Sequence, residues 1–424
     1  MVRQFDFIKK ALAITAMSVN VFSSMSQVTI DECIALAMEN YPLYKQKELT
    51  YLEEDYNLRN NLMKWAPQLS VNAKATYQSE VVEMPFEIPG YDFDISHYQY
   101  GVTADISQMI WDGGAARSNS RMVRANADVK RKQLEVTLYN LRERVENLFL
   151  GILLLDKQIE QNKIQFDNLV RKQKDVESCI GSGVAFKSDL DMVKVNMLNC
   201  RQQETELINN RSAYLKMLGR LVGKELTDEK LVEPEMDITE KGFEINRPEL
   251  YLYDAQLSQN RIQAKELRTR ISPKLNFSLQ LGAGHPGLNM LGNDFQPYYL
   301  AGIKMQWDIG SLYTLKNDKR KVELQKKSIM SERETFILNT SLEMEEQLSV
   351  IDRIKKTIEM DNEIISMRER IKLAAEEQYS NGVIKMIDLM TIMTDEYNAR
   401  LNKAVHEIQL IMALRKYNNI AGNR

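Results

Sequence analysis

Few side chains in the sequence have the types and spacing that catalytic or metal chemistry requires. The three histidines, His97, His285 and His406, lie far apart, and none has a paired nucleophile or metal ligands at a recognisable spacing. We therefore expect no catalytic residues, no metal site and no enzyme activity.

The segment from Gly181 to Ser188 comes closest to a cofactor-binding motif, because it nearly matches a phosphate-binding loop. Phe186 occupies the position where that loop requires glycine. The loop also follows a strand, whereas the apolar pattern before Gly181 indicates a helix. We therefore expect no bound nucleotide and no other cofactor.

Three methionines near the C-terminus, Met386, Met390 and Met393, recur at helical spacing and could indicate export of a soft metal. Methionine is also a common filler of helix cores, because its thioether chain adapts to irregular gaps. We favour the packing role.

The charges and cysteines exclude several classes of protein. With 56 basic and 59 acidic residues the chain is nearly balanced, which gives no electrostatic case for a nucleic-acid partner. The three cysteines, Cys33, Cys179 and Cys200, are widely spaced and odd in number, which argues against disulfide bonds.

The N-terminal segment has the three parts of a secretory signal peptide. Lys9 and Lys10 precede an apolar stretch from Ala11 to Phe22, and small residues follow at Ser24-Met25-Ser26. We expect residues 1–26 to be removed on export. Because no later apolar run is long enough for a transmembrane helix, the exported chain is either soluble in the periplasm or a β-barrel of the outer membrane.

Landmarks in the first half of the chain recur in the second half in the same order, which predicts an internal duplication. The first repeat would occupy residues 27–223 and the second residues 246–424. The matching landmarks are Asn40-Tyr41-Pro42 and Asn246-Arg247-Pro248, Pro67 and Pro273, Trp111-Asp112-Gly113-Gly114 and Trp307-Asp308-Ile309-Gly310, and Gly183 with Asp189-Leu190 and Gly382 with Asp388-Leu389.

Long heptad patterns predict coiled-coil helices within each repeat. Between residues 134 and 176 apolar residues recur at alternating steps of four and three, interrupted by Asn162 and Gln173. The helix would run from about residue 115 to about residue 176, or about 93 Å. Gly181 and Gly183 should break the chain before a second heptad seam in residues 190–221, which makes a helical hairpin.

A two-residue period, typical of β-strands, occurs in residues 68–111 and 274–309. In each segment, apolar and polar residues alternate over two stretches. Such dyads suit a transmembrane β-barrel with lipid outside and water inside, although a half-buried soluble sheet gives the same pattern. We favour the barrel, because the strands follow an export signal and are linked by loops rich in proline and glycine. Four strands cannot close a barrel, so two chains would give eight strands and three would give twelve.

These landmarks resemble those of the TolC-like outer-membrane efflux protein family over nearly the whole mature chain. They are the Asn-x-Pro triplets, the proline before each strand pair, Trp111-Asp112-Gly113-Gly114, and the segment Tyr379-Ser380-Asn381-Gly382 followed by Asp388-Leu389. The resemblance implies an α+β membrane protein, a homotrimer in which four strands per chain make a twelve-stranded barrel. A long α-helical coiled-coil barrel would cross the periplasm, with an equatorial connector at residues 224–245.

The resemblance also implies partners and a gate. The partners are outer-membrane lipid, a periplasmic adaptor (membrane fusion) protein and an inner-membrane pump. Asp388, Asp189 and Tyr379 match the periplasmic constriction of the family, and we expect Tyr379 to hydrogen-bond Asp189. Thr391 stands where some members have a second acidic residue. Adaptor contacts would fall on residues of the hairpin tips, namely Gly183, Val184, Gly382 and Val383.

Both sets of site residues have simpler interpretations. Asp189 and Asp388 could be helix N-caps or exposed charges. Trp65, Trp111 and Trp307 are expected at the periplasmic membrane interface, but Trp65 could instead pack at a helix–strand junction. The function that follows is passive conduction through the outer membrane in a tripartite efflux or secretion system. The alternative is a soluble periplasmic coiled-coil scaffold or adaptor.

Overall fold

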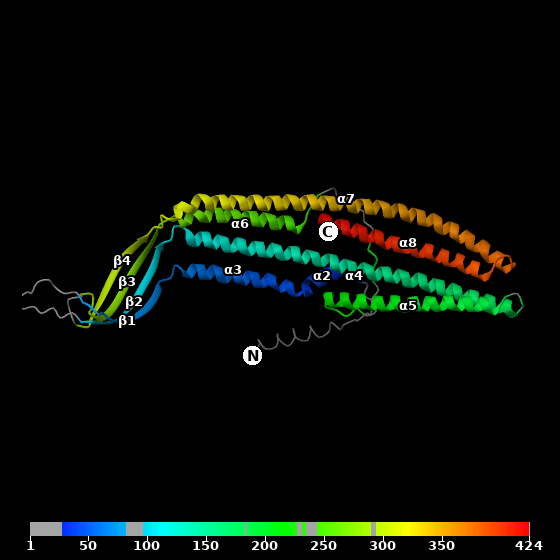
Figure 1. Cartoon of the computed structure of the whole chain (residues 1–424), viewed down its shortest axis with the longest axis horizontal. Helices are drawn as coiled ribbons and strands as arrows, with labels where there is room; N and C mark the ends of the chain where they lie inside the picture. Colours follow the sequence, from blue (N-terminus) through cyan, green and yellow to red (C-terminus); the bar gives the residue numbers. More distant parts are fainter. Residues whose placement is uncertain are drawn as a thin grey trace, which may run out of the picture. The chain divides into compact units, whose positions relative to one another are not determined.

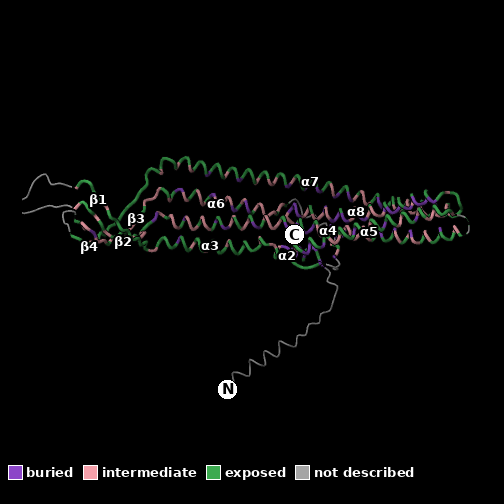
Figure 2. The backbone as a smooth tube through the Cα atoms, turned by 60° about the horizontal axis from the view of Figure 1, so that its bottom comes forward, coloured by how far each residue is buried: buried purple, intermediate pink, exposed green. Residues whose placement is uncertain are grey.

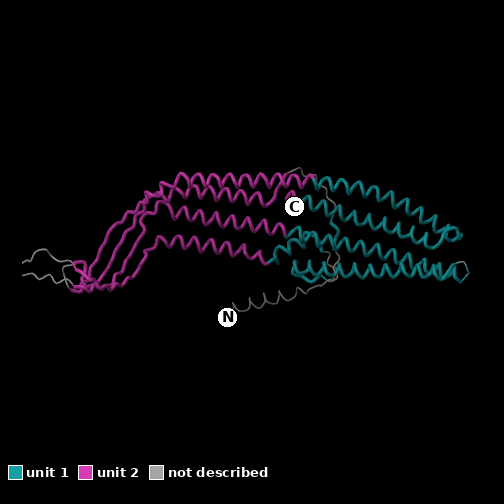
Figure 3. Tube along the Cα trace, viewed as in Figure 1, with its two compact units in different colours: residues 1–41, 141–241, 346–419 teal, residues 42–140, 242–345, 420–424 magenta. Residues whose placement is uncertain are grey.

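A computed structural model of the chain describes residues 28–81, 96–181, 183, 185–226, 231–234, 244–289 and 294–423. The expected signal peptide, Val184 and much of the expected connector lie outside the described residues. The chain forms two compact units, drawn in different colours in Figure 3. Unit 1 comprises residues 1–41, 141–241 and 346–419, and unit 2 comprises residues 42–140, 242–345 and 420–424. Each unit therefore draws on both of the expected repeats.

The order helix, two strands, two long helices occurs twice along the chain (Figure 1). The first set comprises α2 (Ile30–Asn40), the short 3-10 helix η1 (Pro42–Lys45), α3 (Gln46–Met63), β1 (Gln68–Tyr77), β2 (Tyr98–Trp111), α4 (Ala115–Gly181) and α5 (Lys187–Val222). The second comprises α6 (Pro248–Arg270), β3 (Lys274–His285), β4 (Gln296–Gln306), α7 (Ser311–Ser380) and α8 (Met386–Ala421). In the described part of the chain, no helix has both the length and the apolar character to cross a membrane.

Unit 2 contains an antiparallel sheet of four strands in the order β1-β2-β3-β4. The pairing of β2 with β3 joins strands that lie far apart in the sequence, with Tyr100 opposite His285. A β-bulge between Met109 and Trp111 shifts the register near the end of β2. The predicted alternation in both strand segments is confirmed as these four strands.

The register aligns the apolar residues of all four strands on one face of the sheet. Leu69 lies opposite Ile106, Ile106 opposite Leu279, and Leu279 opposite Ala301. Much of this face is uncovered, since Ile303 is 70% exposed and Tyr299 is 74% exposed. Most residues of the two edge strands, β1 and β4, are exposed (Figure 2). The sheet therefore has two faces of opposite character and buries little of the apolar one within the chain.

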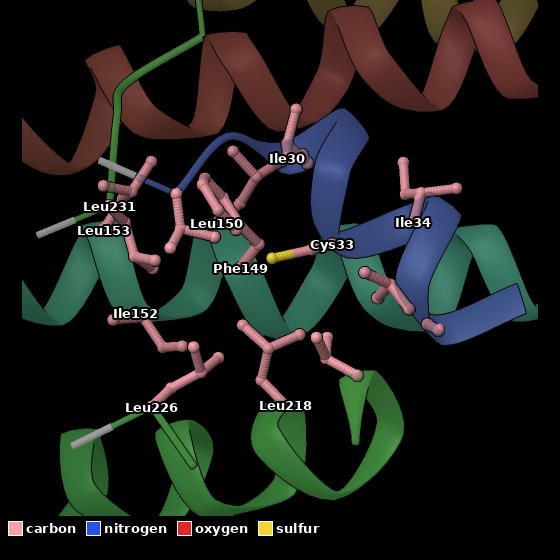
Figure 4. Close-up of a cluster of buried hydrophobic side chains, with 14 of the residues drawn as sticks. Ile30, Cys33, Ile34, Phe149, Leu150, Ile152, Leu153, Leu218, Leu226 and Leu231 are labelled. Carbon is pink, nitrogen blue, oxygen red and sulfur yellow. The ribbon is translucent and has the colours of Figure 1, made fainter. Parts of the chain in front are cut away.

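Unit 1 has a hydrophobic core built by α2, α4 and α5. Ile30 and Cys33 of α2 lie beside Phe149 and Leu150 of α4, whereas Ile152 points to the other side of α4, where Leu218 of α5 lies (Figure 4). Phe149, Ile152 and Leu218 are fully buried, so the heptad seam of α4 finds its partners within the chain.

The predicted helical hairpin is present, but α4 extends beyond its expected end. Gly181 is helical rather than a break, and among the described residues of this turn Gly183 is the one in a left-handed conformation (φ +75°). Asn162, which interrupts the seam, is buried and donates its side-chain amide to the carbonyl of Cys200 at 2.9 Å. The polar residue Asn162 can therefore be buried in the seam, because its side chain hydrogen-bonds to the facing helix α5.

In each half of the chain, the Asn-x-Pro segment meets the end of the last helix of that half. Within unit 1, Asn40 donates its side-chain amide to Leu221 O at 3.2 Å, next to Gly223 at φ +77°. Within unit 2, Asn246 N donates to Ala421 O at 2.7 Å, next to Gly422 at φ +82°. A Cβ at either glycine would collide with the asparagine, which explains why small residues end both helices.

Candidate functional site

Each long helical hairpin of unit 1 turns on a glycine in the left-handed conformation. At the α7–α8 tip, Gly382 has φ +70°, its N–H donates to Tyr379 O at 3.0 Å, and Val383 N–H donates to Gln378 O at 2.8 Å. These two bonds form a Schellman motif, which satisfies the last carbonyls of α7. At the α4–α5 tip, Gly183 N–H donates to Ile180 O at 3.0 Å. A Cβ at either glycine would meet only open space, so the backbone conformation alone requires glycine.

Asp189 and Asp388 occupy equivalent positions at the starts of α5 and α8. Asp189 Oδ2 accepts from Phe186 N at 3.0 Å, and Asp388 Oδ2 accepts from Lys385 N at 3.2 Å. Each carboxylate is the third residue of its helix and bonds back to the capping residue, which is half of a capping box. Both aspartates therefore have a local role at a helix start, although neither is the N-cap itself.

Asp189 lies near enough to Tyr379 for its charge to act on the phenol, whereas the hydrogen bond expected between them is not among those of the described residues and stays a prediction. Tyr379 is half-buried, and burial raises the pKa of its phenol, with further increases from the nearby charges of Asp189 and Cys179. The ammonium group of Lys172 lies 5.9 Å from the centre of the Tyr379 ring. Asp388 is exposed and is not among the charges that raise this pKa.

Lys172 and Cys179 were missed in the sequence analysis, yet a signal for them exists. They are seven residues apart in α4, two helical turns, so they lie on one face of the helix. The position of Lys172 over the Tyr379 ring, and the buried cluster that α4 shares with α7, show that this face meets α7 close to the tips.

The tips also expose apolar side chains. Val383 and Phe186 are both exposed, Phe186 to 76%. Gly183 and Gly382 are exposed as well, while Val184 lies outside the described residues. Aromatic residues, phenylalanine among them, are enriched in the cores of protein–protein interfaces.

The three tryptophans lie where strands meet helices in unit 2. Trp65 follows α3, Trp111 ends β2 and Trp307 follows β4, and each is more than a third exposed. Trp307 donates its indole N–H to Ile271 O at 3.0 Å, and the carbonyl of Trp65 accepts from the side chain of Gln108 at 2.6 Å. All three therefore share one end of the sheet, and two are tied to the helix–strand junction.

Asp112 explains one sequence landmark, because it caps the N-terminus of α4. Its carboxylate is buried and accepts from Gly114 N at 2.8 Å and from Ala116 N at 2.5 Å. Gly113 has φ +69°, and a Cβ there would collide with Ser272. The Trp-Asp-Gly-Gly run is thus the structural junction between β2 and α4.

The opposite end of the sheet carries aromatic rings on its apolar face. Tyr77 packs against Tyr98 with ring centres 5.1 Å apart, and Tyr100 stacks on His285 at 5.3 Å and on Phe295 at 6.1 Å. These pairs are set by strand register, so the alternating pattern alone did not reveal them.

The polar face of the sheet centres on Asp105, which the sequence analysis also missed. Its carboxylate accepts from Asn72 at 2.9 Å, from Thr103 at 3.2 Å and from Gln280 at 2.8 Å. These donors come from three adjacent strands, so the network crosses the pairing between the two halves of the chain.

His406 and His97 make polar contacts. His406 Nδ1 lies 2.6 Å from a carboxylate oxygen of the buried Asp361, and His97 Nδ1 lies 2.9 Å from Gln78 O. The partner of His406 could not be read from the sequence, because Asp361 lies 45 residues away along the chain. Among the residues that the structure describes, no group of three or more His, Cys, Asp or Glu side chains could hold a metal.

The sequence matches no protein-family model, and no curated protein resembles it significantly. Solved structures do resemble it, at low identity. A CusC structure, from a study of transmembrane channel formation, has a TM-score of 0.73 and 13% identity, covering 93% of this chain and 92% of CusC. The outer-membrane protein VceC of Vibrio cholerae has a TM-score of 0.67 and 12% identity, covering 93% of this chain and 96% of VceC. The CmeC outer-membrane channel of Campylobacter jejuni has a TM-score of 0.65 and 14% identity, covering 93% and 85% of the two chains.

The chain thus has the fold of these outer-membrane proteins, helices and four-stranded sheet included, over nearly its whole length. The resemblance predicted from the sequence landmarks is confirmed for the fold.

Proposed function

We propose that the chain is the outer-membrane exit duct of a tripartite efflux or secretion system, and not an enzyme. It passively conducts substrates delivered by a periplasmic adaptor and an inner-membrane pump. The fold shared with outer-membrane channels supports this function, and the resemblance of the sequence landmarks to TolC-like proteins supports the two partners.

The observation that carries the proposal is the uncovered apolar face of the sheet. Apolar residues from four strands lie side by side on it, and many of them are more than half exposed. Soluble monomers rarely leave so large an apolar patch in water, whereas lipid covers the outer face of a transmembrane barrel. β1 has 10 residues and β4 has 11, close to the roughly 9–11 residues of a tilted strand that crosses a bilayer.

The sheet edges require further chains. Open edges in hydrocarbon leave backbone groups unpaired, so several copies must share one closed barrel. Three copies give twelve strands, and the resemblance selects this number. The equivalent glycine turns and aspartates of the two hairpins support an internal duplication.

Aromatic residues at both ends of the sheet fit the two membrane interfaces. The tryptophans Trp65, Trp111 and Trp307 lie at the end joined to the helices, which we assign to the periplasmic side. The cluster around Tyr77 and Tyr100 lies at the other end. Transmembrane barrels have girdles of aromatic residues at both interfaces.

The hairpin tips form the periplasmic gate in this proposal. Asp388 and Asp189 would each make a ring of three carboxylates near the axis of the trimer, and Tyr379 beside Asp189 would hold the entrance closed. Gly183, Val184, Gly382 and Val383 would contact the adaptor, with the exposed Phe186 as a further anchor. The adaptor would open the tips by binding only the splayed state.

Membrane extraction and cross-linking of the full chain test this function. We expect the protein to require detergent for extraction, to cross-link as a trimer and to conduct ions in planar bilayers. Release by osmotic shock as a soluble species without conductance would instead support the periplasmic scaffold.

A further inference from the structure

The four strands of unit 2 contain an unequal set of charges. Their charged residues are Lys74 in β1, Asp105 in β2, Lys274 in β3 and Lys304 in β4. Three are therefore basic and one is acidic, which gives the strands of each chain a net charge of about +2 at neutral pH.

All four charges lie on the polar face of the sheet. Lys74 pairs with Gly101, two residues before Thr103 and four before Asp105 in β2, so it shares their face. Asp105 pairs with Gln280, whose face also contains Lys274. Lys304 pairs with Asn276 on that same face. The apolar face has no Lys, Arg, Asp or Glu within the strands.

Asp105 does not neutralise the lysines. It accepts hydrogen bonds from the uncharged side chains of Asn72, Thr103 and Gln280. Strand register separates it from Lys74 by four residues along β1, about 13 Å, and from Lys274 by six residues along β3, about 20 Å. In β4, Lys304 lies four residues from the residue that the strand register places level with Asp105. That separation is again about 13 Å. These distances exceed the screening length of about 8 Å at physiological salt.

The lysines are exposed and have no ion-pair partner among the residues that the structure describes. Lys274 and Lys304 lie near the end of the sheet that joins the helices, and Lys74 lies toward the other end. The positive charge is thus distributed along the polar face, and Asp105 is the one acidic residue within the four strands.

We propose that this polar face makes the exit lumen selective for anionic cargo, meaning solutes with carboxylate, sulfonate or phosphate groups. The inference rests on the proposed function, which turns the polar face inward and assembles three copies. Nine lysines then face three aspartates across one water-filled lumen. Rings of lysine or arginine select anions in other pores, and substitutions on the lumen face of a barrel tune its selectivity.

The test compares the full-length protein with lumen variants in planar bilayers across a potassium chloride gradient. The triple variant Lys74→Gln, Lys274→Gln, Lys304→Gln should shift the reversal potential toward cations, because it removes three positive charges per chain. The matched variant with arginine at the same positions should keep the parental reversal potential. Asp105→Asn should shift it the opposite way. Because each result is a shift from the parent, charges at the tips cancel from the comparison.

A second measurement tests the class of cargo directly. Proteoliposomes with the parent protein should release a sulfonated dye faster than a quaternary ammonium dye of similar size, and the glutamine triple variant should lose this preference. A glutamine triple variant that conducts normally with an unchanged reversal potential overturns the inference while leaving the proposed function intact. A parent protein that conducts nothing in any bilayer overturns the proposed function, and the inference with it.

Discussion

The helical core of unit 1 and the sheet of unit 2 differ in whether their side chains find partners within the chain. In the core, the heptad residues of α4 find apolar partners in α2 and α5, and the seam residue Asn162 finds a carbonyl acceptor. In the sheet, the apolar face stays uncovered and three lysines have no partner within the described residues. A substitution in the core should therefore act in any solvent, whereas one on the sheet should act only in the assembled membrane state.

The largest expected effect is in the core. Phe149 is fully buried, so Phe149→Ala should cost about 3–5 kcal/mol of stability, through lost burial and the cavity left behind. Thermal unfolding followed by circular dichroism in detergent measures it. The exposed Phe186→Ala at the hairpin tip is the control, and it should unfold like the parent but bind the adaptor more weakly. Equal unfolding of both variants would show that Phe149 contributes no core packing.

A lysine on the apolar face of the sheet should have the next largest effect. Val71→Lys should destabilise the membrane-inserted protein by about 2–4 kcal/mol if the residue lies near the middle of the bilayer. The neighbouring Ser70→Lys, on the polar face, should be tolerated. Denaturant unfolding from lipid vesicles measures both variants. Tolerance of both lysines would mean that no lipid contacts this face.

Removal of the tip carboxylates should change conduction more than stability. Asp388→Ala should cost about 0.3–1 kcal/mol, because it removes a negative charge from the start of α8. In planar bilayers it should shift the reversal potential toward anions and weaken block by divalent ions added from the periplasmic side. Tyr379→Phe should raise conductance, because the phenol beside Asp189 is lost.

Asp388→Asn separates the gate from the helix start. Asparagine keeps an oxygen that can accept from Lys385 N but removes the charge. If the charge forms a gate, the asparagine and alanine variants should change selectivity alike. If selectivity, block and conductance match the parent in all three tip variants, the constriction lies elsewhere.

The smallest expected effect is a pH dependence that originates in unit 1. Burial raises the pKa of Glu146 above its ordinary value of 4.5, and Arg142 and Asn419 oppose this increase only in part. The folded state therefore holds this proton more tightly than the unfolded state. The stabilisation that protonated Glu146 contributes is complete when the pH is below the pKa of this residue in the unfolded state. It is lost as the pH rises through the higher pKa of the folded state.

Glu146→Gln should remove that part of the pH dependence. Denaturant unfolding at a series of pH values between about 4 and 7 measures it. Glu143→Gln, an exposed position in the same helix, is the matched control and should keep the parental profile. A parental profile in the Glu146→Gln variant would contradict the assignment.

The sequence by itself determined the local elements. The alternating pattern after Pro67 and Pro273 predicted β1 to β4, and the heptad pattern predicted α4 and α5. The turns at Gly183 and Gly382 were also predictable, because glycine readily adopts the positive φ that these tips require. Such features depend on backbone preference and on the period of one helix or strand, which a single sequence records.

Only the tertiary structure decided which distant residues meet. The pairing of β2 with β3 placed Gln280 beside Asp105, and the packing of α7 against α4 placed Tyr379 beside Lys172. The pairing of His406 with Asp361 arose in the same way. Periodicity states which face of an element is apolar, but it does not state which other element that face meets or in what register. Those choices depend on the combined packing of many side chains, so they appear only when the chain is folded.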